Sequence, residues 1–262
     1  MLAVLIALPF VVAALAGLYV LYAVVLKPAK CSFRPAHDGS SALHSKVVIC
    51  VGDSLTQATV SGDWLEILRS RFPELSFLNA GVNGDCAYNA RAIRECQPAA
   101  VVVLIGTNDA KAEVNGSWGK HSRLYNGLPQ EPSYDFFRSS LGSALEILLG
   151  PDPSQRPCLA VLTLPMLGES PEHIGNREVV PRYNQALQDL AAAAGKAGGD
   201  LEEMVSTQSS PEPPPVDEFM GLMWQGAALH YLLGWSWDSV GRRQGQRVMS
   251  DALHLILGLL RV

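Results

Sequence analysis

The sequence has few of the features that indicate a nucleic-acid-binding or metal-binding protein. Apart from the pair Arg242-Arg243 it has no basic cluster, and its net charge is -5 over 262 residues. Binding to nucleic acid therefore has no electrostatic support. It has no CxxC pair and no Cys/His spacing typical of a metal site. We expect neither nucleic acid, nor a metal, nor another cofactor as a partner.

Charged side chains are absent from residues 1–26, which lowers the charged fraction of the whole chain to 17%. A helix of this length can cross a hydrocarbon core of roughly 30 Å. A cleaved signal peptide is the alternative, but it normally carries a basic residue before its apolar run and a small-residue cleavage site. Neither is present here. The pattern predicts an uncleaved, single-pass N-terminal transmembrane helix.

The side of the membrane is less well determined. Lys27, Lys30 and Arg34 follow the apolar run, and the positive-inside rule then favours a cytoplasmic domain; a periplasmic domain is the alternative. The odd number of cysteines also favours the cytoplasm, because Cys50 and Cys158 lie in apolar patterns typical of buried free thiols. The polar residues 27–45 are interpreted as a tether, and residues 46–262 as one globular domain.

Within that domain, short apolar runs alternate with helical patterns, which predicts an α/β fold with a parallel sheet and right-handed crossovers. The run at 99–105 is continuously apolar, as expected of a strand buried on both faces. The predicted strands are 47–51, 75–80, 99–105 and 158–164, and the predicted helices are 64–72, 87–96, 132–149, 176–194 and 219–233.

Two segments interrupt the alternation. Residues 110–132 form a polar insertion after the third strand, which is either a lid or substrate wall or a solvated loop. Residues 205–216 are too rich in proline for regular structure and predict an exposed loop. Trp235 and Trp237 are interpreted as packing residues.

Three predicted strands end in residues that suit acyl transfer. Gly52-Asp53-Ser54-Leu55 follows the first strand, a glycine-rich turn containing Gly84 follows the second, and Gly106-Thr107-Asn108-Asp109 follows the third. The carboxyl ends of parallel strands reach the same edge of a sheet, where open α/β folds place ligands. Ser54 could be a nucleophile there, or it could simply be the N-cap of the next helix.

An acyl transfer site needs hydrogen-bond donors for the oxyanion of the tetrahedral intermediate. The main-chain N–H groups of Ser54 and Gly84 and the side-chain amide of Asn108 are the candidates. A serine also needs a base, since its hydroxyl is almost never ionised near neutral pH. Of the six histidines, only His254 has an Asp three residues before it, Asp251. That carboxylate could orient the imidazole and stabilise its protonated form.

These blocks, in this order, resemble those of the GDSL/SGNH hydrolases over about residues 46–255. The resemblance implies a three-layer α/β/α sandwich with a flavodoxin-like sheet, and esterase or lipase chemistry without a metal. It implies Ser54 as nucleophile, Gly84 and Asn108 beside the Ser54 N–H in the oxyanion hole, His254 as base and Asp251 as its partner.

The last block departs from that family's pattern. Ala252 and Leu255-Ile256 stand where the family usually has Gly and a small polar residue, and only eight residues follow His254. Eight residues allow about two helical turns, where the family has a long final helix. We therefore expect a site with the correct residue types, whose activity the altered last block and the short C-terminal segment could weaken.

The sequence analysis thus predicts a membrane-anchored serine ester hydrolase that acts on small-molecule or lipid esters through an acyl-enzyme. The alternatives are a catalytically silent, membrane-tethered binding domain, and an acyltransferase or deacetylase that uses the same site. The acyl chain and the oligomeric state stay open.

Overall fold

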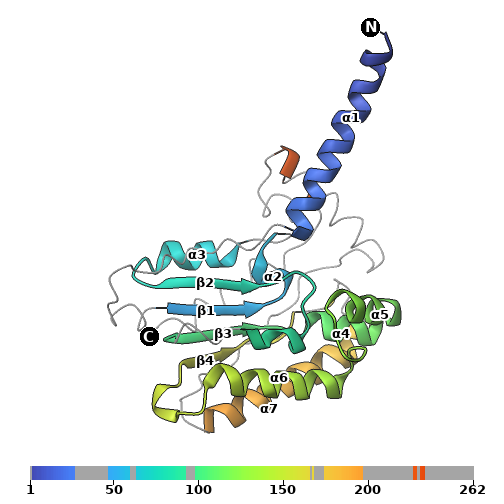
Figure 1. The fold of residues 1–262 in the computed structure, drawn as a ribbon. Helices are drawn as coiled ribbons and strands as arrows, with labels where there is room; N and C mark the ends of the chain where they lie inside the picture. Colours follow the sequence, from blue (N-terminus) through green and yellow to red (C-terminus); the bar gives the residue numbers. More distant parts are fainter. Residues whose placement is uncertain are drawn as a thin grey trace.

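A parallel sheet of four strands forms the centre of the molecule (Figure 1). The computed structural model describes residues 2–26, 47–59, 63–92, 98–165, 167, 174–196, 227–228 and 231–233. The strands lie in the order β2-β1-β3-β4. Their bounds are β1 Val47–Gly52, β2 Ser76–Gly81, β3 Ala100–Leu104 and β4 Cys158–Val161. The predicted parallel sheet is confirmed.

The strand order places a switch point between β1 and β3. The chain crosses from β1 outward to β2 and then returns to β3 on the other side of β1, where Gly52 pairs with Leu104 at the carboxyl ends. Loops that leave the two strands in opposite directions open a crevice at this edge, and open α/β proteins bind ligands there. Ser54 and Asn108 follow these two strand ends.

Alternate residues of β1 face opposite sides of the sheet, as the pleat requires. Val48 and Cys50 pack with Trp64, Leu65 and Leu68 of α3 (Trp64–Arg71).

The other face of β1 carries Val47, Ile49 and Val51, which belong to the larger core beneath α6 (Tyr134–Leu149) and α7 (Val180–Lys196). Figure 1 shows α3 on one side of the sheet and these two helices on the other. Burial on both faces explains why the strands are continuously apolar.

Side-chain caps determine where several helices begin. The carboxylate of Asp63 accepts a hydrogen bond from Glu66 N–H at the start of α3, and the hydroxyl of Ser133 accepts from Phe136 N–H at the start of α6. Both bonds satisfy N–H groups that have no partner within the helix. α6 starts two residues later than predicted because Ser133 occupies the cap.

Other predicted bounds differ from the structure. The segment predicted as a helix from residue 87 is a 3₁₀ helix, η3 (Ala87–Ala92), and β4 ends at Val161, three residues early. The helix predicted at 176–194 begins as a π-helix, η5 (Gly175–Val179), before α7. A short 3₁₀ turn, η4 (Pro153–Gln155), precedes β4. Cys50 is a buried free thiol as predicted, whereas the Cys158 side chain is exposed.

The prediction of a transmembrane helix over residues 1–26, and with it the single-pass membrane localisation, is wrong. In the part of the chain that the structure describes, no helix has both the length and the apolar character needed to cross a membrane. The segment forms α1 (Leu2–Leu21) and a π-helical turn, η1 (Tyr22–Leu26), and α1 extends away from the sheet (Figure 1).

Packing of the end of this segment gives the physical reason. Val20 and Val24 are buried against Ala227 and Tyr231. The Val24 carbonyl accepts hydrogen bonds from the Thr59 hydroxyl, at 3.3 Å, and from the Asn83 amide. The last turns of the apolar run are therefore part of the folded domain. The predicted tether at 27–45, the loop at 205–216, Trp235 and Trp237 lie outside the described residues.

Candidate active site

Ser54 is the first residue of α2 (Ser54–Gln57), directly after β1. Its neighbour Asp53 is the N-cap, with a side-chain oxygen 3.0 Å from the Leu55 nitrogen. The carbonyl of Asp53 also accepts from the N–H groups of Thr56 and Gln57. The alternative in which Ser54 is the N-cap is therefore not observed. Its hydroxyl is not used as a cap, and its side chain is only half-buried.

Gly52 allows this turn to fold tightly over the sheet. A Cβ at Gly52 would lie 2.1 Å from the Thr56 hydroxyl oxygen and 2.5 Å from the Leu104 carbonyl oxygen. Any side chain there would push α2 away from β3. The glycine therefore holds Ser54 close to the carboxyl end of the neighbouring strand.

The turn after β2 brings Gly84 beside the end of β1. We call residues 82–86 the Gly84 loop. Val82 N–H donates to the Gly52 carbonyl at 3.1 Å, and Asp85 N–H donates to the Val82 carbonyl at 3.1 Å. Gly84 is the third residue of this turn and has a φ of 82°, a conformation that glycine adopts without the penalty of a side chain.

Two main-chain N–H groups are available at this edge. Among the residues that the structure describes, neither Ser54 N–H nor Gly84 N–H donates a hydrogen bond. Ser54 is at a helix N-terminus, where N–H groups have no partner within the helix. A negatively charged oxygen at the switch point would accept hydrogen bonds from these two N–H groups.

Asn108 joins the same cluster from the third strand end. It is the second residue of α4 (Thr107–Val114) and is buried, and its Nδ2 donates to the Asp85 carbonyl at 2.9 Å. An amide nitrogen carries two hydrogens, so one remains for another acceptor. The structure thus brings Ser54, Gly84 and Asn108 to one edge. Asp251 and His254 lie outside the described residues.

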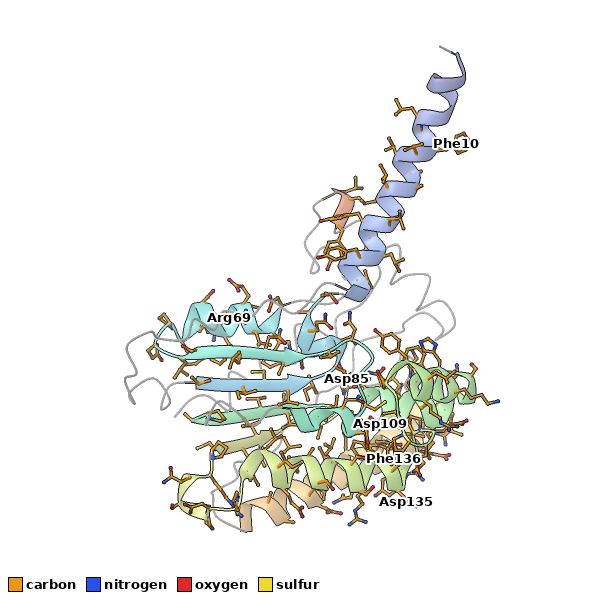
Figure 2. All side chains as sticks on the ribbon, in the orientation of Figure 1. Phe10, Arg69, Asp85, Asp109, Asp135 and Phe136 are labelled. Carbon is orange, nitrogen blue, oxygen red and sulfur yellow. The ribbon has the colours of Figure 1, made fainter. Side chains whose placement is uncertain are left out.

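Three carboxyl groups gather behind this edge, and the sequence analysis missed them. Burial raises the pKa of Asp53 to about 6, that of Asp85 to about 7 and that of Asp109 to about 7. For Asp85 the charges of the two others add to the effect of burial. Asp109 also accepts a hydrogen bond from Ala87 N–H at 3.0 Å. Figure 2 shows Asp85 and Asp109 near each other at the carboxyl ends of the strands.

The signal for this cluster was present in the sequence. Ser54, Gly84 and Asn108 each have an Asp directly beside them in the sequence. The edge that collects these three residues necessarily collects the carboxyl groups too. A cavity of about 180 Å³ lies beside them, between the sheet and η3, and its lining includes Val51, Ala80 and Asp85. Its largely apolar lining is consistent with the raised pKa of Asp85.

The insertion predicted as either a substrate wall or a solvated loop forms two helices, α4 and α5 (Gly116–Tyr125). On α5, the rings of Trp118, His121 and Tyr125 lie in a row. The centroids of Trp118 and His121 are 5.4 Å apart with tilted rings, and those of His121 and Tyr125 are 5.8 Å apart with stacked rings. The row reaches the Gly84 loop, because a Cβ built on Gly84 would be 3.2 Å from the Tyr125 ring. The insertion is therefore helical and not an irregular loop, and the end of α5 contacts the Gly84 loop of the candidate site.

Within the described ranges, no group of three or more His, Cys, Asp or Glu side chains is placed to hold a metal ion. Asp53 and Asp109 accept hydrogen bonds from the main-chain N–H groups of Leu55 and Ala87, respectively.

Residues 50–219 match the model of the GDSL-like lipase/acylhydrolase family. This is well over half of the chain and contains all three strand ends described above. The protein belongs to this family. The resemblance predicted from the short sequence blocks is thus confirmed, and the family makes the protein a carboxylic ester hydrolase.

Solved structures of one enzyme, Axe2, give the same fold. The chain is similar to the acetylxylan esterase Axe2 from Geobacillus stearothermophilus, with a TM-score of 0.50 and 15% identity over 82% of this chain and 92% of Axe2. A weaker likeness is to LAE5, an alpha/beta hydrolase from the metagenome of Lake Arreo, with a TM-score of 0.40 and 18% identity over 57% of this chain and 74% of LAE5. A search of the curated proteins finds no match.

Proposed function

We propose that this hydrolase cleaves small-molecule carboxylic esters through an acyl-enzyme formed on Ser54. The observation that carries the proposal is the convergence of three donors beside a half-buried serine. The N–H groups of Ser54 and Gly84 make no hydrogen bond within the described residues, and the Asn108 amide is bonded to the carbonyl of Asp85, the residue after Gly84. Preorganised donors of this kind are the largest single contribution to catalysis in many acyl transfer enzymes.

In the first half of the reaction, Ser54 Oγ attacks the ester carbonyl carbon and its proton passes to a base. The carbonyl oxygen becomes an oxyanion, which accepts hydrogen bonds from Ser54 N–H, Gly84 N–H and Asn108 Nδ2. Collapse of this intermediate releases the alcohol, which takes the proton from the base, and leaves the acyl group on Ser54. Water then repeats the sequence and releases the carboxylic acid.

The proposed base is His254, oriented by Asp251, on the resemblance of Asp251-Ala252-Leu253-His254 to the last block of the family. The two fully buried carboxyl groups beside the site do not replace it. Asp53 and Asp109 are fully buried and use oxygens as acceptors for main-chain N–H groups, which is a role in holding the loops. A profile of kcat/KM that falls as pH drops through the histidine range would be the signature of His254.

The test compares the wild type with Ser54→Ala on p-nitrophenyl acetate. We expect the substitution to lower kcat by at least about 1,000-fold, since a triad serine acts as a unit with its base. A fluorophosphonate probe should label the wild type at Ser54 and leave Ser54→Ala unlabelled. Equal hydrolysis by the two proteins would refute the proposal. The Ser139→Ala substitution, on an exposed face of α6, is the matched control and should leave both readouts unchanged.

A further inference from the structure

The C-terminal end of α5 is bonded directly to the Gly84 loop. Asn126, the residue that ends this helix, donates from Nδ2 to the Gly84 carbonyl at 2.7 Å, and its own carbonyl accepts from the Asn89 amide at 3.3 Å. The Asn126 N–H closes the last turn on the Ser122 carbonyl. One residue of the insertion thus bonds to both ends of the segment 84–89.

The same loop is held on its other side by the element that carries the nucleophile. Asn83 N–H donates to the side-chain oxygen of Gln57, the last residue of α2, and the Asn83 amide donates to the Thr59 hydroxyl at 2.8 Å. The peptide before Asn83 is therefore held from α2. The peptide after Gly84 is held from α5.

These two attachments determine the direction of the Gly84 N–H. The N–H belongs to the peptide between Asn83 and Gly84, and the carbonyl bonded by Asn126 belongs to the next peptide. Only the φ and ψ of one glycine separate the two planes, and glycine has the widest freedom at these angles. Without Asn126, the peptide after Gly84 would keep the bond from Asp85 N–H to the Val82 carbonyl but would have no partner for the Gly84 carbonyl, which weakens the restraint that keeps φ at 82°.

We propose that Asn126 is a positioning residue for the ester hydrolase reaction: its amide holds the Gly84 peptide so that the Gly84 N–H faces the developing oxyanion. This rests on the proposed function, in which Gly84 N–H is an oxyanion donor. Tyr125 supports the same arrangement, because its ring packs against the Cα side of Gly84. The insertion at 110–132 then contributes to the rate of the reaction through the loop that it holds.

The experiment measures kcat and KM for p-nitrophenyl acetate in Asn126→Ala and Asn126→Asp. The aspartate has the size of asparagine, but an ionised carboxylate has no hydrogen to donate to the Gly84 carbonyl. We expect kcat to fall by about 10-fold if the Gly84 N–H is only tilted and by about 100-fold if it is displaced. KM should change by less than about threefold. Inactivation by a fluorophosphonate, whose phosphoryl oxygen occupies the same hole, should slow by a similar factor.

Asn115→Ala is the matched control. Asn115 caps the other end of α5, where its side chain accepts from the N–H groups of Ser117 and Trp118 at 3.1 and 3.2 Å. Its loss weakens the same helix and leaves the contact with Gly84 in place, so the melting temperature should fall while kcat stays within about twofold.

The outcomes separate this inference from the function on which it rests. Wild-type hydrolysis that does not depend on Ser54 would refute the proposed function, and this inference with it. Ser54-dependent hydrolysis with an unchanged kcat in folded Asn126→Ala and Asn126→Asp would overturn the positioning role alone. So would an equal loss of kcat in Asn115→Ala, because the effect would then come from the stability of α5.

Discussion

At the scale of single residues, the candidate site depends on two glycines that act in different ways. Gly52 is needed for space, because a Cβ there would collide with Thr56 and with the Leu104 carbonyl. Gly84 is needed for conformation, because its φ of 82° is rarely adopted by residues with a side chain. Both glycines place main-chain groups at distances and angles that larger residues would not allow.

Gly84→Ala should reduce both activity and stability. The alanine would be strained by about 1 kcal/mol or more at this φ, and its Cβ would press on the Tyr125 ring from 3.2 Å. A rotation that relieves this strain turns the N–H away from the oxyanion, so kcat should fall by at least about 10-fold. Steady-state kinetics and urea unfolding measure the two effects.

Gly150→Ala is a suitable comparison for that substitution. Gly150 ends α6 with a φ of 70°, and a Cβ there would have no neighbour within 4 Å among the described residues. The Gly150→Ala variant should be less stable than the wild type and should keep the wild-type kcat. If Gly84→Ala and Gly150→Ala were equally active, Gly84 would have only a structural role.

At the scale of elements, two segments outside the predicted strands are bonded to the Gly84 loop of the candidate site. α5 bonds to the Gly84 loop through Asn126, and the end of the N-terminal segment bonds to the same loop through the Val24 carbonyl and Asn83. Since both contacts end at adjacent residues, the insertion and the N-terminal segment both contribute to the placement of one turn.

Substitutions at different positions of the N-terminal segment should differ in their effect on stability, although the whole segment is apolar. Val24 is 5% exposed and packs with Ala227, whereas Val12 on α1 is 56% exposed. Val24→Ala should lower the free energy of unfolding by about 1.5 kcal/mol, the value of two buried methylene equivalents, and Val12→Ala by less than about 0.5 kcal/mol. Urea unfolding of both variants tests this. Equal effects would show that Val24 is not part of the folded core. Phe10, which projects from α1 in Figure 2, belongs with Val12 on the exposed part of the helix.

At the scale of the whole molecule, the topology concentrates three carboxyl groups at one place. Asp53, Asp85 and Asp109 come from three different strand ends, and the sheet order brings them together behind the candidate oxyanion donors. Each has a pKa above the ordinary value of about 3.8, and burial is the first cause in every case. The folded protein therefore holds protons at pH values where the unfolded chain has released them.

This cluster predicts a fall in stability as pH rises. Because the folded-state pKa values of about 6 and about 7 exceed the unfolded value, the native state binds more protons between about pH 4 and pH 7. The free energy of unfolding should decrease through this range and then level off. Asp85→Asn should flatten this decrease and should stabilise the protein at pH 8 by at least about 1 kcal/mol, the equivalent of about one pKa unit.

Urea unfolding between pH 4.5 and pH 8 measures that effect. Asp135→Asn is the control, since Asp135 is exposed in the first turn of α6, away from the cluster (Figure 2). It should keep the slope of the wild type. A slope for Asp85→Asn equal to that of the wild type would show that Asp85 does not exchange its proton over this range.

The sequence by itself determined the sheet and three of the residues that meet at its carboxyl edge, Ser54, Gly84 and Asn108. Runs such as 47–51 and 99–105 are short, rich in valine and apolar at every position, which is typical of parallel strands covered on both faces. The carboxyl ends of such strands meet at one edge of the sheet. Ser54, Gly84 and Asn108 follow those strands directly, which is why their meeting could be predicted without coordinates.

Only the tertiary structure decided the environment of these residues. The run at 1–26 was misread as a membrane anchor because hydropathy records the character of a segment and not its partners. Val24 is buried by Ala227 and bonded by Thr59 and Asn83, which are 35 or more residues away in the chain. The bond from Asn126 to Gly84 also spans 42 residues. Contacts over such distances depend on how the chain folds back on itself, and no local pattern of residue types contains that information.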